Sequence, residues 1–152
     1  MAMTMYFDMD GTLFDLYGVE DWLPMLEAKD PTPYKIAEPL IRFSTFARLI
    51  NAVQRKGIKI GVISWLAKNS TPEYDLAVTT AKMEALKRRL PSVKWDYIHI
   101  IPYGTPKYEY ATDEDILFDD EDKNRMEWEG TSFDEKNIFN ILKIVLDKRF
   151  EV

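Results

Sequence analysis

The stretch MYFDMDGTLFD, residues 5–15, places three aspartates within eight positions, directly after an apolar start. Its apolar residues predict a short strand over residues 4–9, so that Asp8 and Asp10 fall where the strand ends. A carboxylate in such a place loses hydration, which costs free energy unless a partner compensates its charge. The stretch therefore indicates a functional turn whose partners must come from elsewhere in the chain.

Apolar strands and amphipathic helices alternate after this stretch. Runs rich in Ile, Val and Leu predict buried strands over residues 58–64, 95–101 and 115–120. Helical spacing of apolar residues predicts helices over about residues 44–56, 71–90 and 134–149. This order indicates an α/β fold with a mostly parallel sheet that helices cover on both faces.

The chain of 152 residues fits a single domain, residues 1–152, with one core. Residues 15–43 contain four prolines and are the one plausible insertion, with room for a short helix in VEDWLPMLEA, residues 19–28. This segment is too short for an independent domain, so we expect at most a small cap or flap there. RMEWEGTSF, residues 125–133, is expected to leave little room for a full fifth strand.

Composition limits the classes of partner. The formal net charge of −6 argues against a general nucleic-acid binder, and the absence of cysteine excludes disulfides and thiolate metal sites. The N-terminal residues lack the pattern of a signal peptide, and no run approaches the roughly 18 apolar residues of a membrane span. We therefore expect a cytoplasmic protein with no membrane partner.

Acidic residues follow two of the expected strands. Parallel strands end at one edge of a sheet, where open α/β sheets bind their ligands. If the first and fourth strands are neighbours, Asp8, Asp10 and Asp119 surround one point. Clustered carboxylates need a cation, and oxygen ligands without histidine or cysteine suit Mg²⁺.

Such a site fits phosphoryl transfer. An aspartate can accept a phosphoryl group, while Mg²⁺ and Lys107 supply positive charge. Ser64, at the end of the second strand, can donate a hydrogen bond, and Asp10 can move a proton. Lys68 lies four residues after Ser64 and is an alternative to Lys107 for holding the phosphate.

Four segments resemble the motifs of the haloacid dehalogenase-like (HAD) phosphohydrolase superfamily. FDMDGTLFD is similar to the first motif, GVIS to the second, the lysine of GTPKYEY to the third and ILFDDEDKN to the fourth. The matches span residues 4–124, and the first and fourth are specific in combination. The resemblance implies a Rossmann-like three-layer α/β/α sandwich with a minimal or absent cap. It also implies an Mg²⁺-dependent phosphatase that works through an aspartyl-phosphate.

The resemblance implies a role for each matched position. Asp8 would be the nucleophile and a metal ligand, and Asp10 would be the general acid and base with its backbone carbonyl on the metal. Asp119 would bind Mg²⁺ directly, with Asp120 and Asn124 beside the ion or one layer behind it. The phosphate would be approached or held by Gly11, Thr12, Ser64 and Lys107.

The short insertion indicates an open site. In this family, open sites often accompany macromolecular substrates or oligomers in which a neighbour covers the site. The expected partner is a phosphorylated small molecule, nucleotide or macromolecule, and the sequence leaves open whether the chain forms a homo-oligomer. Two alternatives to a hydrolase remain: a binding or regulatory module without turnover, and a phosphotransferase with an alcohol acceptor. A dehalogenase fits less well, because that branch needs no Mg²⁺.

Five further residues have two interpretations each. Asp15 is either a guide for the loop after the first strand or a plain turn residue. His99, the one histidine, is expected to be a packed or edge residue rather than a catalyst. Trp65, Tyr103 and Tyr108 fall near the expected site, where aromatic rings can stack on a nucleobase, although such residues more often belong to a core or rim.

Overall fold

The computed structural model describes residues 3–147. In that part, five strands form one parallel sheet in the order β3-β2-β1-β4-β5. They are β1 (Thr4–Phe7), β2 (Lys59–Trp65), β3 (Tyr97–Ile101), β4 (Ile116–Phe118) and β5 (Thr131–Phe133). The order reverses at β1, which lies between β2 and β4, and this is where an open α/β sheet binds its ligands. The predicted parallel α/β fold is confirmed, and the first and fourth strands are neighbours.

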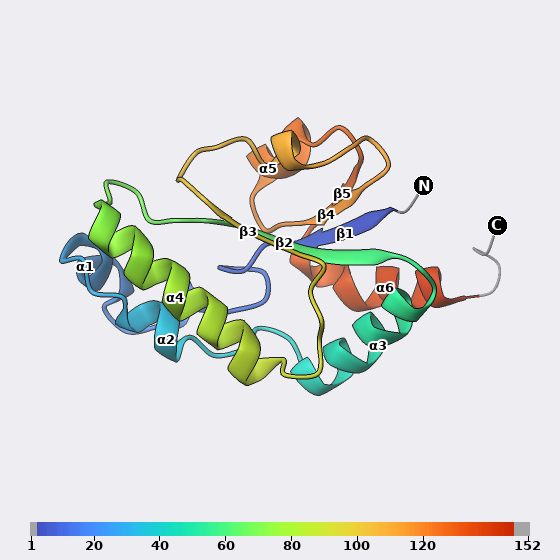
Figure 1. Cartoon of the computed structure of the whole chain (residues 1–152), viewed down its shortest axis with the longest axis horizontal. Coiled ribbons are helices and arrows are strands. Elements are labelled where there is room, and N and C mark those ends of the chain that lie inside the picture. The colour runs from blue at the N-terminus through green and yellow to red at the C-terminus, as the bar shows by residue number, and fades with distance from the viewer. Residues whose placement is uncertain (1–2, 148–152) are drawn as a thin grey trace.

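Helices lie on both faces of the sheet, as Figure 1 shows. Three of them, α3 (Phe43–Arg55), α4 (Pro72–Arg89) and α6 (Ile138–Leu146), lie on one face, and α5 (Asp122–Glu127) lies on the other. The connections from β1 to β2 and from β2 to β3 run in the same direction, so right-handed crossovers place α3 and α4 on the same side. The connection from β4 to β5 runs the opposite way and places α5 on the opposite face. The result is the predicted three-layer sandwich, with a thin layer on the α5 face.

Aromatic packing holds the centre of the sheet. The rings of Phe7 in β1 and Phe118 in β4 stack with centroids 4.8 Å apart. Phe46 of α3 meets the Phe7 ring edge to face at 5.1 Å. A shift of register would turn these buried side chains out of the core, so the packing fixes where β1 and β4 end. The residues that follow, Asp8 and Asp119, are positioned by this core.

Helix α4 begins where the sequence predicts. The hydroxyl of Thr71 accepts a hydrogen bond from the backbone N–H of Tyr74 at 3.2 Å, and Pro72 occupies the first turn. The helix ends at Arg89, before Pro91. Among residues 3–147, no helix combines the length and apolar character needed to cross a membrane.

The segment after β4 forms a short fifth strand. Residues 125–133 are expected to leave little room for a full fifth strand, and the strand found there has three residues. Thr131–Phe133 pairs in parallel with Ile116–Phe118 and forms β5. A strand of three residues is too short to show a periodic pattern, which explains why the sequence does not reveal it. Gly130 allows the close pairing, because a Cβ there would lie 2.2 Å from the carbonyl oxygen of Asp115.

The last helix also starts later than predicted. A short 3₁₀ turn, η3 (Glu135–Asn137), precedes α6, which begins at Ile138. The carboxylate of Asp134 accepts a hydrogen bond from the backbone N–H of Lys136 at 3.0 Å and caps this turn. The helix ends at Leu146 and Asp147 is extended, so it ends before the expected residue 149, which itself lies outside the described residues.

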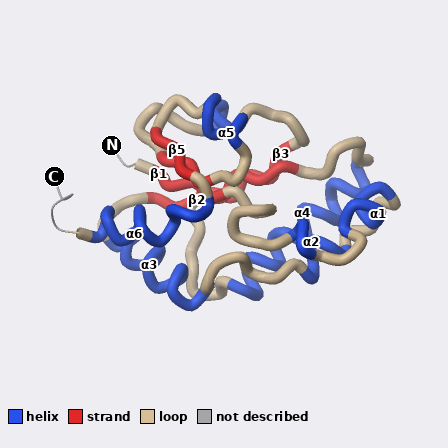
Figure 2. Tube along the Cα trace, turned by 180° about the vertical axis from the view of Figure 1, so that it is seen from behind, coloured by secondary structure: helices blue, strands red, loops and turns tan. Residues whose placement is uncertain are grey.

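Residues 16–36, which we call the flap, follow β1 and contain η1 (Leu16–Gly18), α1 (Trp22–Glu27) and α2 (Thr32–Ile36). Asp15 caps η1 by accepting a hydrogen bond from the N–H of Gly18 at 3.0 Å. Both views place α1 and α2 beside α4 (Figures 1 and 2), and the hydroxyl of Tyr74 donates to the carbonyl of Asp30 at 2.9 Å. We propose that the chain is one domain in which this flap takes the place of a cap.

Candidate active site

Two carboxylates meet at the ends of the central strands. Phe7 and Phe118 are paired in register, so the residues that follow them, Asp8 and Asp119, are neighbours. The N–H of Asp8 donates to the carbonyl of Phe118 at 2.9 Å and extends the strand pairing by one step. Both side chains are buried, with 6% of Asp8 and 0% of Asp119 exposed. Two neighbouring buried carboxylates require positive charge nearby.

Lys107 supplies this charge. Its Nζ lies 2.8 Å from Oδ1 of Asp8 and 2.7 Å from Oδ2 of Asp119, and the residue is buried. Burial by itself would lower the pKa of Lys107, but the charges of Asp8 and Asp119 outweigh it and raise the pKa. The ammonium therefore stays charged between the two acids. Lys68, the alternative, is exposed and borders the same cavity.

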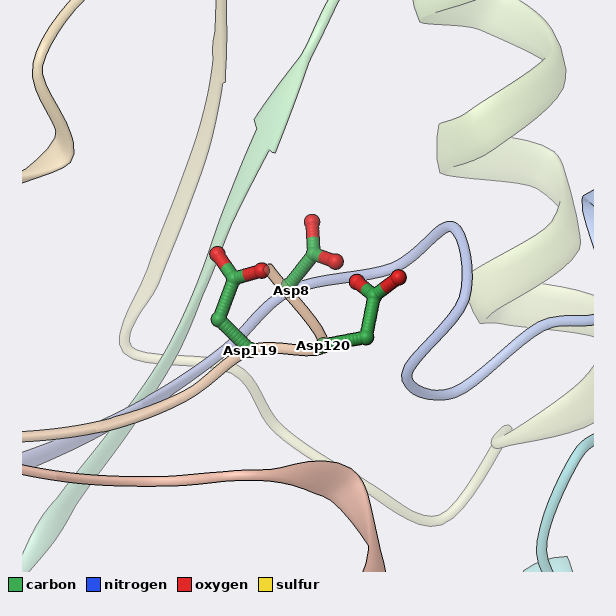
Figure 3. A group of neighbouring side chains, drawn as sticks. All are labelled: Asp8, Asp119 and Asp120. Atoms are coloured by element: carbon green, nitrogen blue, oxygen red, sulfur yellow. The ribbon is translucent and has the colours of Figure 1, made fainter. Parts of the chain in front are cut away.

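A third carboxylate, from Asp120, completes a group that fits a cation. Figure 3 shows Asp8 after β1 and Asp119 and Asp120 after β4. One oxygen atom from each lies within 4.8 Å of the others. With all three ionised, Lys107 balances one charge and leaves two, which matches a divalent cation. The Oδ1 atom of Asn124 is buried without a hydrogen-bond partner, while its Nδ2 donates to Asp119 at 3.1 Å.

These oxygen donors suit Mg²⁺, which prefers carboxylate and carbonyl oxygens. Burial, the charge of Asp8 and a hydrogen bond with Asp8 together raise the pKa of Asp120 to about 8. Burial and the charge of Asp8 also raise the pKa of Asp119, against the opposing effect of Lys107. Asp119 and Asp120 thus hold protons more tightly than usual, and a bound cation would favour their ionised forms.

Gly11 and Thr12 join the loop after β1 to the loop after β4. Gly11 has a φ of +84°, and a Cβ there would lie 2.3 Å from Oδ2 of Asp120. The hydroxyl of Thr12 lies 3.0 Å from Oδ2 of Asp8 and accepts a hydrogen bond from the N–H of Asp120 at 3.2 Å. The structure places these two expected phosphate-binding residues directly against the carboxylates.

Asp10 belongs to a second group. Its Oδ2 lies 2.8 Å from Nζ of Lys82, a residue in the middle of α4 that is 1% exposed. The same ammonium donates to Oγ of Ser64 at 2.6 Å and to the carbonyl of Trp65 at 2.7 Å. An ammonium has three protons, and these three acceptors use them all. Since the Oγ of Ser64 accepts from Lys82, its own proton is left for another acceptor.

Lys82 is not among the site residues expected from the sequence. Most lysines of a surface helix are exposed, so its type alone suggests nothing. A signal exists in its spacing, because Tyr74, Val78 and Leu86 are buried and Lys82 falls between them at the same interval of four residues. A lysine on the apolar face of a helix must find buried acceptors, and here they are Asp10 and Ser64.

Residues of both groups line a cavity of about 280 Å³, Asp8, Asp119 and Lys107 from the first and Asp10 from the second. Asp8, Asp119 and Lys107 are buried at its inner end, while Tyr17 of the flap and Tyr103 after β3 are 47% and 53% exposed and border its mouth. The other lining aromatic residues are Trp22, Tyr34 and Trp65.

The remaining residues with two interpretations lie elsewhere. Tyr108, 40% exposed, is not among the described residues that line this cavity. His99 stacks on Tyr97 with ring centroids 5.8 Å apart and meets Tyr110 at 4.9 Å. Burial lowers the pKa of His99. It is a packed residue of edge strand β3.

Comparison with solved structures finds chains with a similar fold. The chain is similar to the crystal structure of D,D-heptose 1,7-bisphosphate phosphatase from Burkholderia thailandensis, with a TM-score of 0.49 and 12% sequence identity. The match covers 82% of this chain and 70% of that one. No family model and no curated protein matches the sequence. At this identity and TM-score the likeness concerns the course of the chain, and the function proposed below rests on the side chains of the site.

Replacing Gly11 by alanine tests the close approach of Asp120. The new Cβ would strain a left-handed backbone and displace the Asp120 carboxylate, so we expect a loss of about 1–3 kcal/mol in unfolding free energy and weaker Mg²⁺ binding. Gly57→Ala is the matched control, because Gly57 has a φ of +93° with nothing within 4 Å of its Cβ position. Thermal unfolding and calorimetric Mg²⁺ titration measure both effects. Equal losses and unchanged Mg²⁺ affinity in the two variants would contradict the assignment.

The raised pKa of Asp120 predicts a pH-dependent stability. A carboxyl group with a pKa of about 8 in the folded state and 3.8 when unfolded destabilises the fold progressively as pH rises between these values. With EDTA present, Asp120→Asn should therefore be more stable than the wild type at about pH 8, by roughly 3–6 °C in Tm, with a smaller gain at about pH 5. Excess Mg²⁺ should reverse the order. A gain that does not vary with pH would refute this explanation.

Proposed function

We propose that the chain is an Mg²⁺-dependent phosphomonoesterase that works through an aspartyl-phosphate on Asp8. The observation that carries this proposal is the buried bridge of Lys107 between Asp8 and Asp119, which with Asp120 form a group of three carboxylates that fits a divalent cation. The four segments that resemble HAD motifs support the same assignment. Their matched residues belong to the carboxylate group around Lys107 or to the group around Lys82, or they border one of the two.

Asp8 is suited to attack phosphorus. Its Oδ1 contacts the Lys107 ammonium and its Oδ2 lies within hydrogen-bond distance of the Thr12 hydroxyl, so the carboxylate is held in one orientation. A phosphate dianion would repel an uncompensated carboxylate, and Lys107 reduces that repulsion. Mg²⁺, bound by Asp8, Asp119 and Asp120 with Asn124 beside them, would supply further positive charge to the phosphoryl oxygens. Ser64 can donate its free proton to one of these oxygens.

Asp10 is suited to move the proton. In the first step, Asp8 forms a bond to phosphorus while the bond to the ester oxygen breaks, and Asp10 gives its proton to the departing alcohol. In the second step, water attacks phosphorus, Asp10 takes a proton from it, and phosphate leaves Asp8. Lys82 holds Asp10 and Ser64 in a fixed relation throughout, because it contacts both.

Replacing Asp8 tests the nucleophile. Asp8→Asn should lower phosphate release from phosphomonoesters by about a thousandfold or more, because an amide cannot form the acyl phosphate, and circular dichroism should show an unchanged fold. Wild-type activity should require Mg²⁺ and disappear with EDTA. Asp15→Asn is the matched control, since Asp15 comes from the same stretch but caps η1.

Three other results of these assays would contradict the proposed hydrolase, each in a different way. Full activity in Asp8→Asn would refute the covalent mechanism. Absence of phosphate release from a broad panel of small and macromolecular phosphoesters would favour a binding module. Transfer to an added alcohol in preference to water would identify a phosphotransferase.

Replacing Lys82 tests its positioning of Asp10. Lys82→Met keeps the size of the side chain but removes all three hydrogen bonds. We expect kcat to fall about a hundredfold for an alkyl phosphate, whose leaving group must be protonated, and about tenfold or less for p-nitrophenyl phosphate, whose leaving group departs as an anion. Lys87→Met, at an exposed position of the same helix, is the control. Equal losses for the two esters would show a merely structural role.

A further inference from the structure

The cavity above the candidate site is more aromatic than phosphoryl transfer requires. Tyr17 and Trp22 of the flap lie edge to face, with ring centroids 4.9 Å apart. Trp65 and Tyr103, from the ends of β2 and β3, lie 5.1 Å apart. All four line the same cavity, so its wall presents two pairs of rings from distant parts of the chain.

One of these rings is held in place next to the catalytic group. The indole N–H of Trp65 donates to the carbonyl of Thr105 at 2.8 Å, which fixes the plane of the ring. Its centroid lies 5.5 Å from Nζ of Lys107, the ammonium that contacts Asp8. This indole is therefore a rigid ring that lines the cavity one side chain away from the attacking carboxylate.

The charges of the cavity indicate what kind of substrate it can take. Lys107 serves the transferred phosphate, and Lys68, at an exposed position, is the other cation among the lining residues described. A second phosphate group would thus find little support. The volume of about 280 Å³ is near the lower limit for small-molecule sites and suits one ring system.

We propose that the site selects phosphomonoesters whose alcohol carries a flat aromatic ring, which stacks against the aromatic wall of the cavity. This proposal rests on the phosphatase function proposed above and names its substrate class. Two kinds of phosphomonoester carry such a ring: a nucleoside monophosphate, through its base, and an ester with a phenyl ring close to the phosphate. Stacking on a fixed indole and the tyrosines at the mouth would favour either one over a saturated group of the same size.

The test compares esters with similar leaving groups. Benzyl phosphate and cyclohexylmethyl phosphate are both esters of primary alcohols and differ in the flatness of the ring. Uridine 5′-monophosphate and ribose 5-phosphate share the same primary ester and differ in the base. We expect kcat/KM to favour the flat ring about tenfold in at least one pair, mainly through KM. Preference in the first pair alone would identify a phenyl ring, and preference in the second would identify a nucleobase.

Variants of the tyrosines at the mouth of the cavity test whether the aromatic wall causes the preference for a flat ring. Tyr103→Ala and Tyr17→Ala remove exposed rings, so the fold should survive, and each should reduce the preference severalfold. Tyr108→Ala, which removes a tyrosine of similar exposure outside the cavity, should keep the preference.

A wild-type enzyme that hydrolyses all four esters without a ring preference would overturn this inference and leave the proposed function intact. If the wild type hydrolyses none of them, the proposed function fails for these esters. Calorimetric binding of the first pair to Asp8→Asn with Mg²⁺ then decides the ring preference alone, and equal affinities would overturn it.

Discussion

The buried ammonium of Lys107 between Asp8 and Asp119 is the interaction on which the site depends. Two carboxylates at the ends of adjacent central strands would repel each other strongly in a dry environment. Lys107 reaches them from a 3₁₀ turn, η2 (Lys107–Tyr110), in the connection between β3 and β4. The sheet can therefore keep both acids at its centre, with charge left over for a divalent cation.

A second buried lysine, Lys82, holds the other polar residues of the site. Lys82 of α4 contacts Asp10 and Ser64, so that a helix on one face of the sheet holds the residues that would handle the proton and a phosphoryl oxygen. Asp8 and Asp10 are only two positions apart in the chain, but they contact different lysines. Asp8 pairs with Lys107 and Asp10 pairs with Lys82. Asp8 is directed toward Asp119 and Asp120, and Asp10 toward α4. This separation gives neighbouring residues of one loop different surroundings, which is what a nucleophile and a proton carrier require.

Much of this arrangement is predictable from the sequence. The strand endings locate Asp8 and Asp119, and the parallel order of the sheet follows from apolar strands that alternate with amphipathic helices. The resemblance of GTPKYEY to the third motif favours Lys107 over Lys68 for holding the phosphate, which stays a prediction, and Lys107 contacts Asp8 and Asp119. The roles of the site residues stay predictions. The sequence does not reveal strand β5, because three residues are too few to show a periodic pattern. It does not reveal the role of Lys82 either, because the burial of this lysine depends on acceptors far away in the chain.

The sequence by itself determined the α/β architecture and the identity of the acidic residues at the strand ends, because hydrophobic periodicity and motif spacing are local properties. Only the tertiary structure decided which charges pair, that Asp120 lies near Asp8 and Asp119, and that the flap brings Tyr17 and Trp22 to the same cavity as Trp65. These are contacts between segments that lie far apart along the chain. They depend on how helices and loops pack on the sheet, and no local pattern encodes that packing.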